Sequence, residues 1–580
     1  MDDRRIWGHC SPQQPLDAGA HMTKRQNLFL LSLVAAMPMA CGKGSGDDTG
    51  GPNAEEFYVE TADGIIYAGD ASLGDFPGLT ATPNIDDDDQ DGTVDWSGSD
   101  ISADNDLGYL WIETREKEID VTLSGDTNSI RVWSDTGVIL GEGASNSATI
   151  GASTDLVGLR VEFETWLNQG SLVFSDGTDS FEVRITASPL ILNHHLQPTT
   201  EVMMVKFNSM GSSYNNMDII NAYEEVLGDR FTAIKANKYG NDPWVQDEFQ
   251  FAYMMGHDSY MEFVIDSIRN GQGQPGDGLD NVPEDLFEGP DFAIGEWGGG
   301  RASSLDYGGN LEVTPPVTVD GVEYPFGRVF YGGDNSYHPK DELRDFLDSQ
   351  QVQDPFMIDS TWLCVGHVDE FISTVPDSSS DTGFKVVVTD THAAWAILDA
   401  MEPSTPLARY GASGYNGHSL PTVGAITGSN SIRRLNDEVQ EIVDAELEIF
   451  MTELGLDESD IIRMPSLFEE PRGCGDWVAA LIPGMTNMIV SESDDGTPVL
   501  FMADPFMRTD ENDQSADPII ANVREIMPEG VETYFVDDWY VYHMMLGEVH
   551  CGSNERREPT VSTWADAAHL IEDTIATEAE

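Results

Sequence analysis

The pattern of apolar residues changes near residue 189, and this change constrains the fold more than any other feature of the chain. From about Glu55 to Ser188, apolar and polar residues alternate in short segments such as LRVEFETWL and FEVRITA, with Gly, Asp and Ser turns between them. Such alternation is typical of the antiparallel strands of a β-sandwich. Beyond Pro189, strand-like segments such as GFKVVVTD alternate with helical ones, which indicates a mixed domain.

We therefore expect a chain of the α+β class, with an immunoglobulin-like antiparallel β-sandwich over residues 55–188 and one large α/β domain over residues 189–580. A length of 580 residues agrees with two domains, because single hydrophobic cores stop growing at ~250–300 residues. The clearest helix is the segment NSIRRLNDEVQEIVDAELEIFMTEL. Its apolar residues recur at helical spacing, and Gly455 follows it as the expected C-cap.

The N-terminal residues resemble a bacterial lipoprotein signal. Lys24 and Arg25 precede an apolar run from Leu28 to Ala40, which is too short to span a bilayer and suits the apolar part of a signal peptide. The run ends in MPMAC, so residues 1–41 are interpreted as a signal segment with a loose lipobox and Cys41 as the lipidated residue. Plain secretion with cleavage near Ala40 is the alternative, and either interpretation predicts an extracytoplasmic protein.

Residues 42–54 are predicted to be a flexible linker, and residues 1–21 resemble no signal, so translation starts at either Met1 or Met22. The formal net charge is −74, from 103 acidic and 29 basic residues. Such a field repels nucleic acid and anionic membranes, and it favours cations or basic partners. We therefore expect no nucleic-acid partner, and membrane contact only through a lipid anchor.

The five cysteines of the chain are too few and too scattered for a disulfide framework. Besides Cys10 and Cys41 they are Cys364, Cys474 and Cys551, and one disulfide among these three stays open. A free thiol that remains in an extracytoplasmic protein indicates either chemistry or burial.

The densest carboxylate cluster is the segment NIDDDDQDGTVDW, Asn84 to Trp96. Crowded carboxylates repel one another unless a cation is present, and hard oxygen ligands suit calcium. The spacing D-x-D-x-D-G-x-x-D of calcium loops is matched by Asp87, Asp89, Asp91, Gly92 and Asp95. The terminal glutamate of an EF-hand is missing, since its position falls on Gly98. We expect an irregular calcium loop between strands, with a solvated acidic turn as the alternative.

Four stretches supply two isolated carboxylates, a histidine and a thiol. They are NDPWVQDEFQFAY (Asn241–Tyr253), VIDSIRNG (Val264–Gly271), CVGHVDEF (Cys364–Phe371) and GEVHCGSN (Gly547–Asn554). Carboxylates that hydrogen-bond a guanidinium in its own plane hold it best. A thiolate could then add to its carbon while a histidine moves the protons. Each stretch alone is a weak signal, since a buried cysteine is more often part of the core.

Together these stretches closely resemble the catalytic domain of the protein-arginine deiminases, members of the guanidino-group-modifying (pentein) superfamily. The resemblance covers roughly residues 195–557 in the family's order. It also takes in GPDF (Gly289–Phe292), GNLEVTPPVTVDGVEYPFGR (Gly309–Arg328), FLDSQQVQ (Phe346–Gln353) and ELGLDESDII (Glu453–Ile462). It implies a five-bladed α/β propeller of ββαβ units with the active site at its centre, preceded by a calcium-binding sandwich domain.

The resemblance also implies a role for each catalytic residue. Cys551 is the nucleophile, Asp247 and Asp369 grip the guanidinium, His367 is the general acid/base, and Trp244 lines the slot for the aliphatic arm of arginine. The sulfur attacks the guanidinium carbon, ammonia leaves with a proton from the histidine, and water hydrolyses the thiouronium intermediate to citrulline. Holding the substrate between two anions and splitting one substitution into two steps agree with this chemistry.

Calcium ligands follow from the same resemblance. In the sandwich the implied ligands are Asn84, Asp86 and Asp88, a register that competes with the Asp87/Asp89/Asp91 spacing. In the catalytic domain one site is implied at Glu248, Asp266, Ser267 and Asn270, and another at Gln246, Leu311 (through its carbonyl) and Glu312. The second site departs from the family pattern, because Gln250 stands where the family has a glutamate and Gly308 falls at a backbone ligand position.

The positions that hold the substrate peptide also depart from the family. Arg269 is kept, but its second arginine is Gly271, and the basic pair before the nucleophile is Met545 and Leu546. The acidic surface should still attract arginine-rich proteins, so arginine-containing proteins or peptides are the favoured substrates of a calcium-dependent enzyme. The alternatives are a deiminase of free arginine or another small guanidine, and a calcium-dependent adhesion lipoprotein with an inactive catalytic fold.

Overall fold

The computed structural model describes residues 58–61, 64–67, 78–98, 101, 106–207, 215–256, 260–269, 275–287, 289–411, 419–559 and 567–571. Ala54–Glu580 form one compact unit, separate from Met1–Asn53. The predictions for the signal segment, the linker, the translation start, Cys41, Asn270 and Gly271 lie outside the described residues. None of the helices described is long and apolar enough to cross a membrane.

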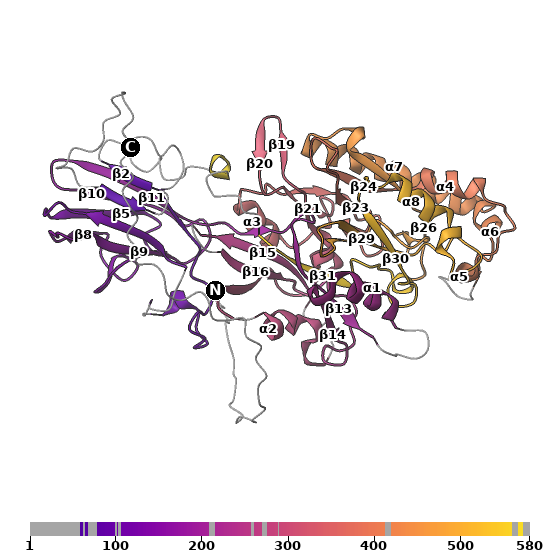
Figure 1. The fold of residues 1–580 in the computed structure, drawn as a ribbon, viewed down its shortest axis with the longest axis horizontal. Coiled ribbons are helices and arrows are strands. Elements are labelled where there is room, and N and C mark those ends of the chain that lie inside the picture. The colour runs from indigo at the N-terminus through magenta and orange to yellow at the C-terminus, as the bar shows by residue number, and fades with distance from the viewer. Residues whose placement is uncertain are drawn as a thin grey trace. The chain divides into compact units, whose positions relative to one another are not determined.

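The N-terminal part of the unit consists of two sheets that share one core (Figure 1). One sheet has the order β2-β1-β4-β9-β6-β7 and the other β3-β11-β10-β5-β8. The strands are β1 (Tyr58–Thr61), β2 (Gly64–Tyr67), β3 (Leu79–Ala81), β4 (Gly108–Glu113), β5 (Ile119–Gly125), β6 (Ile130–Ser134), β7 (Gly137–Gly141), β8 (Ser147–Ile150), β9 (Val157–Phe163), β10 (Gln169–Ser175) and β11 (Ser180–Ala187). The pairs are antiparallel except β3–β11.

Side-chain alternation explains why these segments form strands. In β5, Ile119, Val121 and Leu123 are buried, whereas the intervening Asp120 and Thr122 are exposed. A period of two places all three apolar side chains on one face, where they join Leu110 of the other sheet in a single cluster. The sheets therefore pack face to face, as in a sandwich.

The rest of the unit contains helices and further strands. The strands are β12 (Ile191–Leu192), β13 (Thr199–Lys206), β14 (Phe231–Lys235), β15 (Phe249–Met255), β16 (Tyr260–Asp266), β17 (Phe292–Glu296), β18 (Leu311–Val313), β19 (Val317–Val319), β20 (Val322–Tyr324), β21 (Val329–Gly332), β22 (Phe356–Ile358), β23 (Ile372–Pro376), β24 (Phe384–Asp390), β25 (Ile461–Pro465), β26 (Phe468–Glu469), β27 (Ala479–Ala480), β28 (Ile489–Glu492), β29 (Pro498–Ala503), β30 (Glu532–Val536) and β31 (Ser553–Arg557). The α-helices are α1 (Met217–Leu227), α2 (Val282–Leu286), α3 (Asp341–Ser349), α4 (Thr391–Ala400), α5 (Ala408–Gly411), α6 (Val423–Thr427), α7 (Asn430–Leu454) and α8 (Pro518–Ile526).

Five sheets repeat one pattern within the described residues: β12-β15-β16-β17, β14-β13-β31, β18-β21-β22, β23-β24-β25 and β28-β29-β30. In each, a central strand has one antiparallel and one parallel neighbour. Parallel strands need a crossover, usually a helix. Here α1, α2, α3 and α8 each lie between two such strands, and α4 to α7 lie between β24 and β25. The mixed α+β class is therefore confirmed, whereas closure into a propeller and immunoglobulin-like connectivity stay predictions.

The predicted long helix is confirmed as α7. It begins after Ser429, whose side chain accepts a hydrogen bond from the backbone N–H of Ile432, and it ends at Gly455 in the left-handed region with φ 66°. Val443, Leu447 and Phe450 are on its buried face, at the spacing expected for an amphipathic helix.

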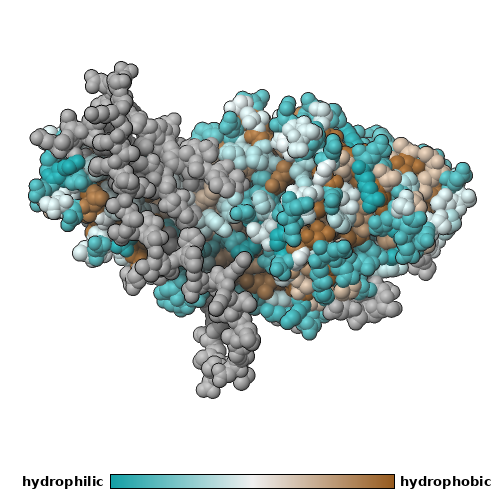
Figure 2. Space-filling view, viewed as in Figure 1, coloured by the Kyte–Doolittle hydropathy of each residue, from teal (hydrophilic) through white to brown (hydrophobic). Residues whose placement is uncertain are grey.

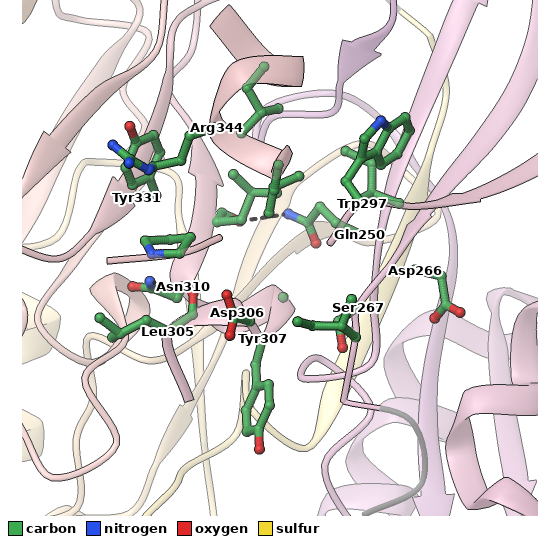
Figure 3. A pocket seen from close by; sticks show the side chains of 17 residues that line it. Gln250, Asp266, Ser267, Trp297, Leu305, Asp306, Tyr307, Asn310, Tyr331 and Arg344 are labelled. Atoms are coloured by element: carbon green, nitrogen blue, oxygen red, sulfur yellow. Dashed lines mark hydrogen bonds between the residues drawn. The ribbon is translucent and has the colours of Figure 1, made fainter. Parts of the chain in front are cut away.

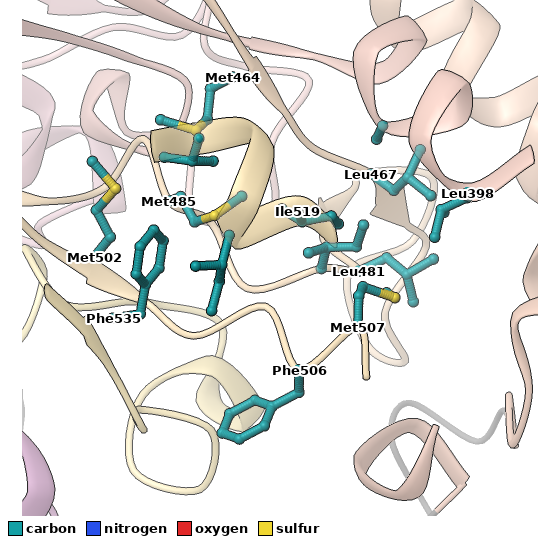
Figure 4. Close-up of a cluster of buried hydrophobic side chains, with 14 of the residues drawn as sticks. Leu398, Met464, Leu467, Leu481, Met485, Met502, Phe506, Met507, Ile519 and Phe535 are labelled. Atoms are coloured by element: carbon teal, nitrogen blue, oxygen red, sulfur yellow. The ribbon is translucent and has the colours of Figure 1, made fainter. Parts of the chain in front are cut away.

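Apolar packing holds neighbouring sheets together. Figure 4 shows a cluster in which Leu398 of α4 and Met464 of β25 meet Met502 of β29, Ile519 of α8 and Phe535 of β30. Burying each such side chain contributes about 1.5–3 kcal/mol, so the two sheets and their loops keep a defined relative position. On the outside, Figure 2 shows hydrophilic side chains over most of the coloured surface, with separate apolar patches between them.

Candidate active site

Each of the five sheets contributes to one site through the residues that precede its antiparallel strand. Asp247 lies before β15, Gly309 before β18, Asp369 before β23, Asn487 before β28 and Cys551 before β31. These residues are separated by up to about 300 positions in sequence, and their contacts are made only because the five sheets converge.

Cys551 is buried and is the free cysteine of the described chain. Asn487 Nδ2 lies 3.2 Å from the Cys551 Sγ. The side-chain Oδ1 of Asn487 accepts hydrogen bonds from the backbone N–H groups of His550 and Cys551. Asp369 Oδ2 is 3.8 Å from the sulfur. Burial, together with the negative charges of Asp369 and Asp247, holds the pKa of the Cys551 thiol well above its usual value.

Two carboxylates face this site with oxygens that have no protein partner. Asp369 Oδ2 is 2.8 Å from His550 Nδ1, but Asp369 Oδ1 has no hydrogen bond within the described residues. Asp247 Oδ1 is likewise buried and without a hydrogen bond there, and burial raises the pKa of Asp247 to about 6. A buried carboxylate oxygen without a hydrogen bond costs free energy. Both of these oxygens are therefore suited to accept hydrogen bonds from a ligand.

His367 is fully buried and oriented by the backbone. Its Nε2 is 2.8 Å from the carbonyl of Ser304, so in the neutral ring Nε2 carries the hydrogen and Nδ1 the lone pair. Nδ1 lies 3.8 Å from Asp247 Oδ1 and has no hydrogen bond among the residues described. The backbone N–H groups of Gly366 and His367 both donate to Glu370 Oε1 at 3.0 Å, which fixes the loop. A proton carrier thus lies beside the carboxylates.

Gly309 leaves the space between these groups open. A Cβ at this position would be 2.7 Å from His367 Nδ1 and 3.1 Å from Asp369 Oδ2. Both distances are shorter than ordinary van der Waals contact, so any other residue would fill the gap between the histidine and the carboxylate. The spacing of the sequence gave no signal for this role.

Trp244 lies against the loop that carries the thiol. Its ring is 5.6 Å from the ring of Tyr542, and a Cβ on Gly547 would clash with it. On the same loop a cavity of about 370 Å³ reaches Cys551. Its lining consists of Glu370, Phe468, Ala479, Ala480, Gly484, Asn487, His543, Leu546, Gly547, Glu548 and Cys551. Trp244 is not among these lining residues, so its role as a wall of the arginine slot stays a prediction.

Arg269 is buried rather than presented to solvent. It pairs with Asp242 Oδ2 at 2.8 Å, with Glu248 Oε1 and with Asp247 Oδ2 at 4.0 Å, and its guanidinium lies 5.5 Å from the ring centre of Tyr307. Its hydrogen bonds go to Asp242 and Glu248, whereas Asp247 is at the limit of ion-pair distance. Contact with substrate stays a prediction.

The first predicted calcium site of the catalytic domain fits a cation. Glu248 Oε2 and Asp266 Oδ1 are buried without hydrogen bonds in the part of the chain described. Burial raises the pKa of Glu248 to about 8 and that of Asp266 to about 9. A divalent ion would stabilise both carboxylates in the charged form. Figure 3 shows Asp266 and Ser267 at a cavity of about 510 Å³, to which Tyr307 and Gln250 also contribute.

The second predicted site, at Gln246, Leu311 and Glu312, does not fit calcium as well. The Gln246 amide donates to Gln250 Oε1 at 2.9 Å. The Gln250 amide in turn donates to the Leu311 carbonyl at 3.0 Å, which is the dashed line in Figure 3. Gln250 Oε1 and the Leu311 carbonyl, which would face a cation, therefore each accept a hydrogen bond from one of these amides. The single carboxylate, Glu312, instead lies 3.1 Å from His195 Nε2. Calcium affinity falls with fewer charged ligands.

In the acidic loop, the two alternative sets of predicted calcium ligands belong to two separate groups of carboxylates. Carboxylate oxygens of Asp86, Asp88 and Asp106 lie within 4.8 Å of one another, as do those of Asp87, Asp89 and Asp95. In the first group, Asp86 Oδ1 and Asp106 Oδ2 are buried without hydrogen bonds in the described chain, and burial raises the pKa of Asp86 to about 9 and that of Asp106 to about 7. This group fits a cation.

Other members of the loop have different surroundings. Asp87 accepts hydrogen bonds from the backbone N–H groups of Asp91 and Gly92, and Asp91 itself is exposed and outside both groups. Asn84 donates to Glu162 at 3.0 Å. The loop also contacts the mixed domain, since Asp86 accepts a hydrogen bond from the backbone N–H of Asp291.

A disulfide joins Cys364 and Cys474, with 5.6 Å between their Cα atoms. This pairing, which the sequence left open, tethers the loop that carries His367 to residues 471–478. Sequence reasoning gave no role to Asn487 and Asp106, which lie outside the motifs that they join. It also gave none to His550, which is next to Cys551 in the sequence, because its contact with Asp369 depends on the fold.

The site brings together the thiol, the two carboxylates and the histidine that the predicted motifs supply, and the chain was compared with known proteins. The family model of the protein-arginine deiminases matches residues 177–565. The chain belongs to the protein-arginine deiminase family. It is 33% identical over 409 residues to protein-arginine deiminase type-4 of Rattus norvegicus, covering 68% of this chain and 57% of the relative. The Homo sapiens type-4 enzyme is 32% identical over 405 residues, covering 68% of this chain and 57% of that protein.

The chain thus spans about 57% of the length of these protein-arginine deiminases. Among solved structures, an agmatine deiminase of C. jejuni has a TM-score of 0.34 and 12% identity, and the match covers 64% of this chain and 97% of that one. Such a distant likeness adds nothing to the description of the fold.

Proposed function

We propose that this chain is a calcium-dependent protein-arginine deiminase, which hydrolyses the guanidinium of peptidyl-arginine to peptidyl-citrulline and ammonia. One observation carries the proposal. Asp247 Oδ1, Asp369 Oδ1 and His367 Nδ1 are all buried without hydrogen bonds in the described chain, and they belong to the same site as the free thiol of Cys551. A guanidinium offers N–H donors in one plane and a positive charge, which matches these acceptors.

In the proposed reaction the two aspartates orient the guanidinium beside the sulfur. The thiol is held protonated by burial and by the neighbouring negative charges, so the arriving cation, by offsetting those charges, favours the thiolate. The thiol proton passes to His367 as the sulfur adds to the guanidinium carbon, and His367 then gives that proton to the leaving nitrogen, which departs as ammonia. Water then attacks the thiouronium carbon, a proton returns to His367, and citrulline and the thiol are released.

Calcium would be held by Glu248, Asp266 and Ser267 near the site and by Asp86, Asp88 and Asp106 in the sandwich. When bound, it supplies the positive charge that keeps these buried carboxylates ionised. Contacts within the chain also position these residues. The Arg269 guanidinium lies 4.0 Å from Asp247 Oδ2, and the backbone N–H of Ser267 donates a hydrogen bond to the Glu248 carbonyl.

The architecture that we propose for residues 189–580 is the five-bladed α/β propeller. Five sheets of the same strand order, each contributing residues to one site from the loop before its antiparallel strand, support it. The β-sandwich of residues 55–188 would then serve as a calcium-binding domain. Scattering and hydrogen-exchange measurements on the purified chain would test both boundaries.

A deiminase of free arginine or another small guanidine is the second candidate. Two observations favour it: Arg269 is buried among carboxylates, and Met545, which replaces a basic residue of the family, is exposed. An inactive adhesion protein is disfavoured, because all four predicted catalytic residues are present.

A side-by-side assay separates these functions. Purified chain is given an arginyl peptide or free arginine, with calcium or with EGTA, and citrulline is quantified. We expect peptide turnover in calcium, its loss in EGTA, and its loss in Cys551→Ser. Turnover of free arginine alone would support the second candidate, and full activity of Cys551→Ser would refute the nucleophile.

An extracytoplasmic location with Cys41 as a lipid-carrying residue is also a proposal, supported by the MPMAC sequence after an apolar run. Globomycin treatment of the native host should cause the unprocessed precursor to accumulate. Normal processing under the drug would instead favour plain secretion.

A further inference from the structure

One tryptophan of the sandwich packs against the mixed domain. Trp166 lies in the turn between β9 and β10, which belong to the two different sheets of the sandwich. Its ring nitrogen donates a hydrogen bond to the sulfur of Met254 in β15, at 2.9 Å. The turn therefore extends from the sandwich to the sheet β12-β15-β16-β17 of the mixed domain.

Three aromatic rings of the mixed domain surround this indole. The ring centre of Trp166 lies 5.7 Å from that of Phe263 in β16 and 5.7 Å from that of Trp297. It also lies 5.1 Å from the ring centre of Phe346 in α3, which stacks on Trp297 at 3.7 Å. Gly295 makes room for this packing, because a Cβ there would lie 2.6 Å from Phe263 and 2.9 Å from Trp297. We call Trp166, Phe263, Trp297 and Phe346 the aromatic cluster.

The aromatic cluster adjoins the calcium site proposed at the end of β16. Phe263 is in the same strand as Asp266 and precedes it by three residues. Trp297 directly follows β17, which pairs with β16 up to Asp266. Trp297, Asp266 and Ser267 all line the cavity shown in Figure 3. The packing of Trp166 therefore reaches the segment that carries Asp266 and Ser267.

A second side chain of the sandwich enters the same core. Ile85 of the acidic loop and Trp166 both pack against the buried cluster that contains Phe263 and Ile265. Phe263 and Ile265 share one face of β16, because side chains alternate along a strand. Asp266 follows them as the last residue of that strand. Sandwich side chains thus complete the core that lies behind this calcium ligand.

Calcium ligands must lie about 2.3–2.6 Å from the ion, so a small displacement of Asp266 weakens binding. Without the indole, the neighbouring rings and strands would relax into the space left behind, because protein interiors are close-packed. We propose that Trp166 is a positioning residue. By packing on Phe263 and Trp297 it fixes the end of β16, and it thereby raises the calcium affinity of the Asp266 site. The sandwich is then part of a site to which it supplies none of the proposed ligands.

This inference rests on the calcium site of the proposed function, so its experiment measures calcium binding rather than deimination. Calorimetry gives the affinity of the purified full chain for calcium, and native mass spectrometry gives the number of ions. We expect Trp166→Ala to lower the affinity for one ion about tenfold, within the range typical of coupled sites. Trp166→Phe, which keeps an aromatic ring in the cluster, should recover most of that loss. Trp111→Ala, at an exposed tryptophan of β4, is the control and should bind calcium as the wild type does.

The affected ion is identified in an Asp266→Asn background. The calcium held by Asp266 is already lost there, so adding Trp166→Ala should leave the affinity for the remaining ions unchanged. Persistence of the loss in that background would overturn the proposal, since Trp166 would then act on another site or on the whole fold. Wild-type affinity in Trp166→Ala would overturn it as well. A wild-type chain that binds no calcium would instead refute the proposed calcium site itself, and with it this role.

A readout that leaves Trp166 in place covers the case in which Trp166→Ala does not fold. Coupling between two sites is reciprocal, so calcium at the Asp266 site should slow hydrogen exchange in the turn of residues 164–168. We expect calcium to protect this turn in the wild type and to protect it less in Asp266→Asn. Equal protection in the two proteins would contradict the proposal.

Discussion

Replacing Gly309 with alanine tests the geometry of the site most directly. The added methyl group would lie 2.7 Å from His367 Nδ1 and 3.1 Å from Asp369 Oδ2, in the gap where we propose that the guanidinium binds. Either the two side chains separate or the substrate is displaced. Misplacement of reacting groups by about 1 Å costs about 10²-fold, which corresponds to about 2.7 kcal/mol in the activation barrier.

We therefore expect kcat/KM of Gly309→Ala for an arginyl peptide to fall about 100-fold, while its melting temperature stays close to that of the wild type. Citrulline release under calcium-saturated conditions gives the rate, and circular dichroism gives the stability. Gly299→Ala is the matched control, because a Cβ there meets no atom within 4 Å, and it should retain full activity.

Wild-type kcat/KM in folded Gly309→Ala would refute the reasoning, since the gap between His367 and Asp369 would then not be where substrate binds. A loss of stability equal to the loss of activity would count against it too, because the effect would then be structural. A proton-transfer defect alone would leave KM unchanged, whereas displacement of the cation raises it.

Three further results are expected. Replacing Cys364 and Cys474 by serine should lower the free energy of unfolding by about 2–5 kcal/mol and lower activity, because His367 lies on the tethered loop; unchanged denaturation curves would contradict this. Burial raises the pKa of Glu548 to about 8 in the folded chain. The folded state therefore binds more protons than the unfolded one, and the stability contributed below the usual pKa near 4.5 is lost as pH rises toward 8. Glu548→Gln should flatten this slope in denaturation at pH 5.5 and 8.5, and an identical slope would oppose it. Asp266→Asn should remove one calcium from the native mass spectrum, and a full complement would exclude that site.

Local features of the sequence were enough to identify the strands of the sandwich and helix α7, and to propose candidates for the site. The alternation in β5 and the helical spacing from Asn430 to Leu454 reflect local backbone geometry. They can therefore be recognised in the sequence without knowing the rest of the fold. The chemistry of Cys551, His367 and the aspartates was equally visible, because each lies in a short motif. Their pairing into one site followed from the resemblance to a family rather than from spacing.

The tertiary structure alone decided which distant groups meet. Asn487 approaches Cys551, Cys364 pairs with Cys474, Asp106 joins Asp86, and Gln250 engages the carbonyl that calcium was expected to use. These contacts depend on how whole sheets pack, since the entropy of closing a long loop is offset only by the core formed around it. Sequence patterns report which side chains are buried, whereas the path of the chain determines what each buried polar atom faces.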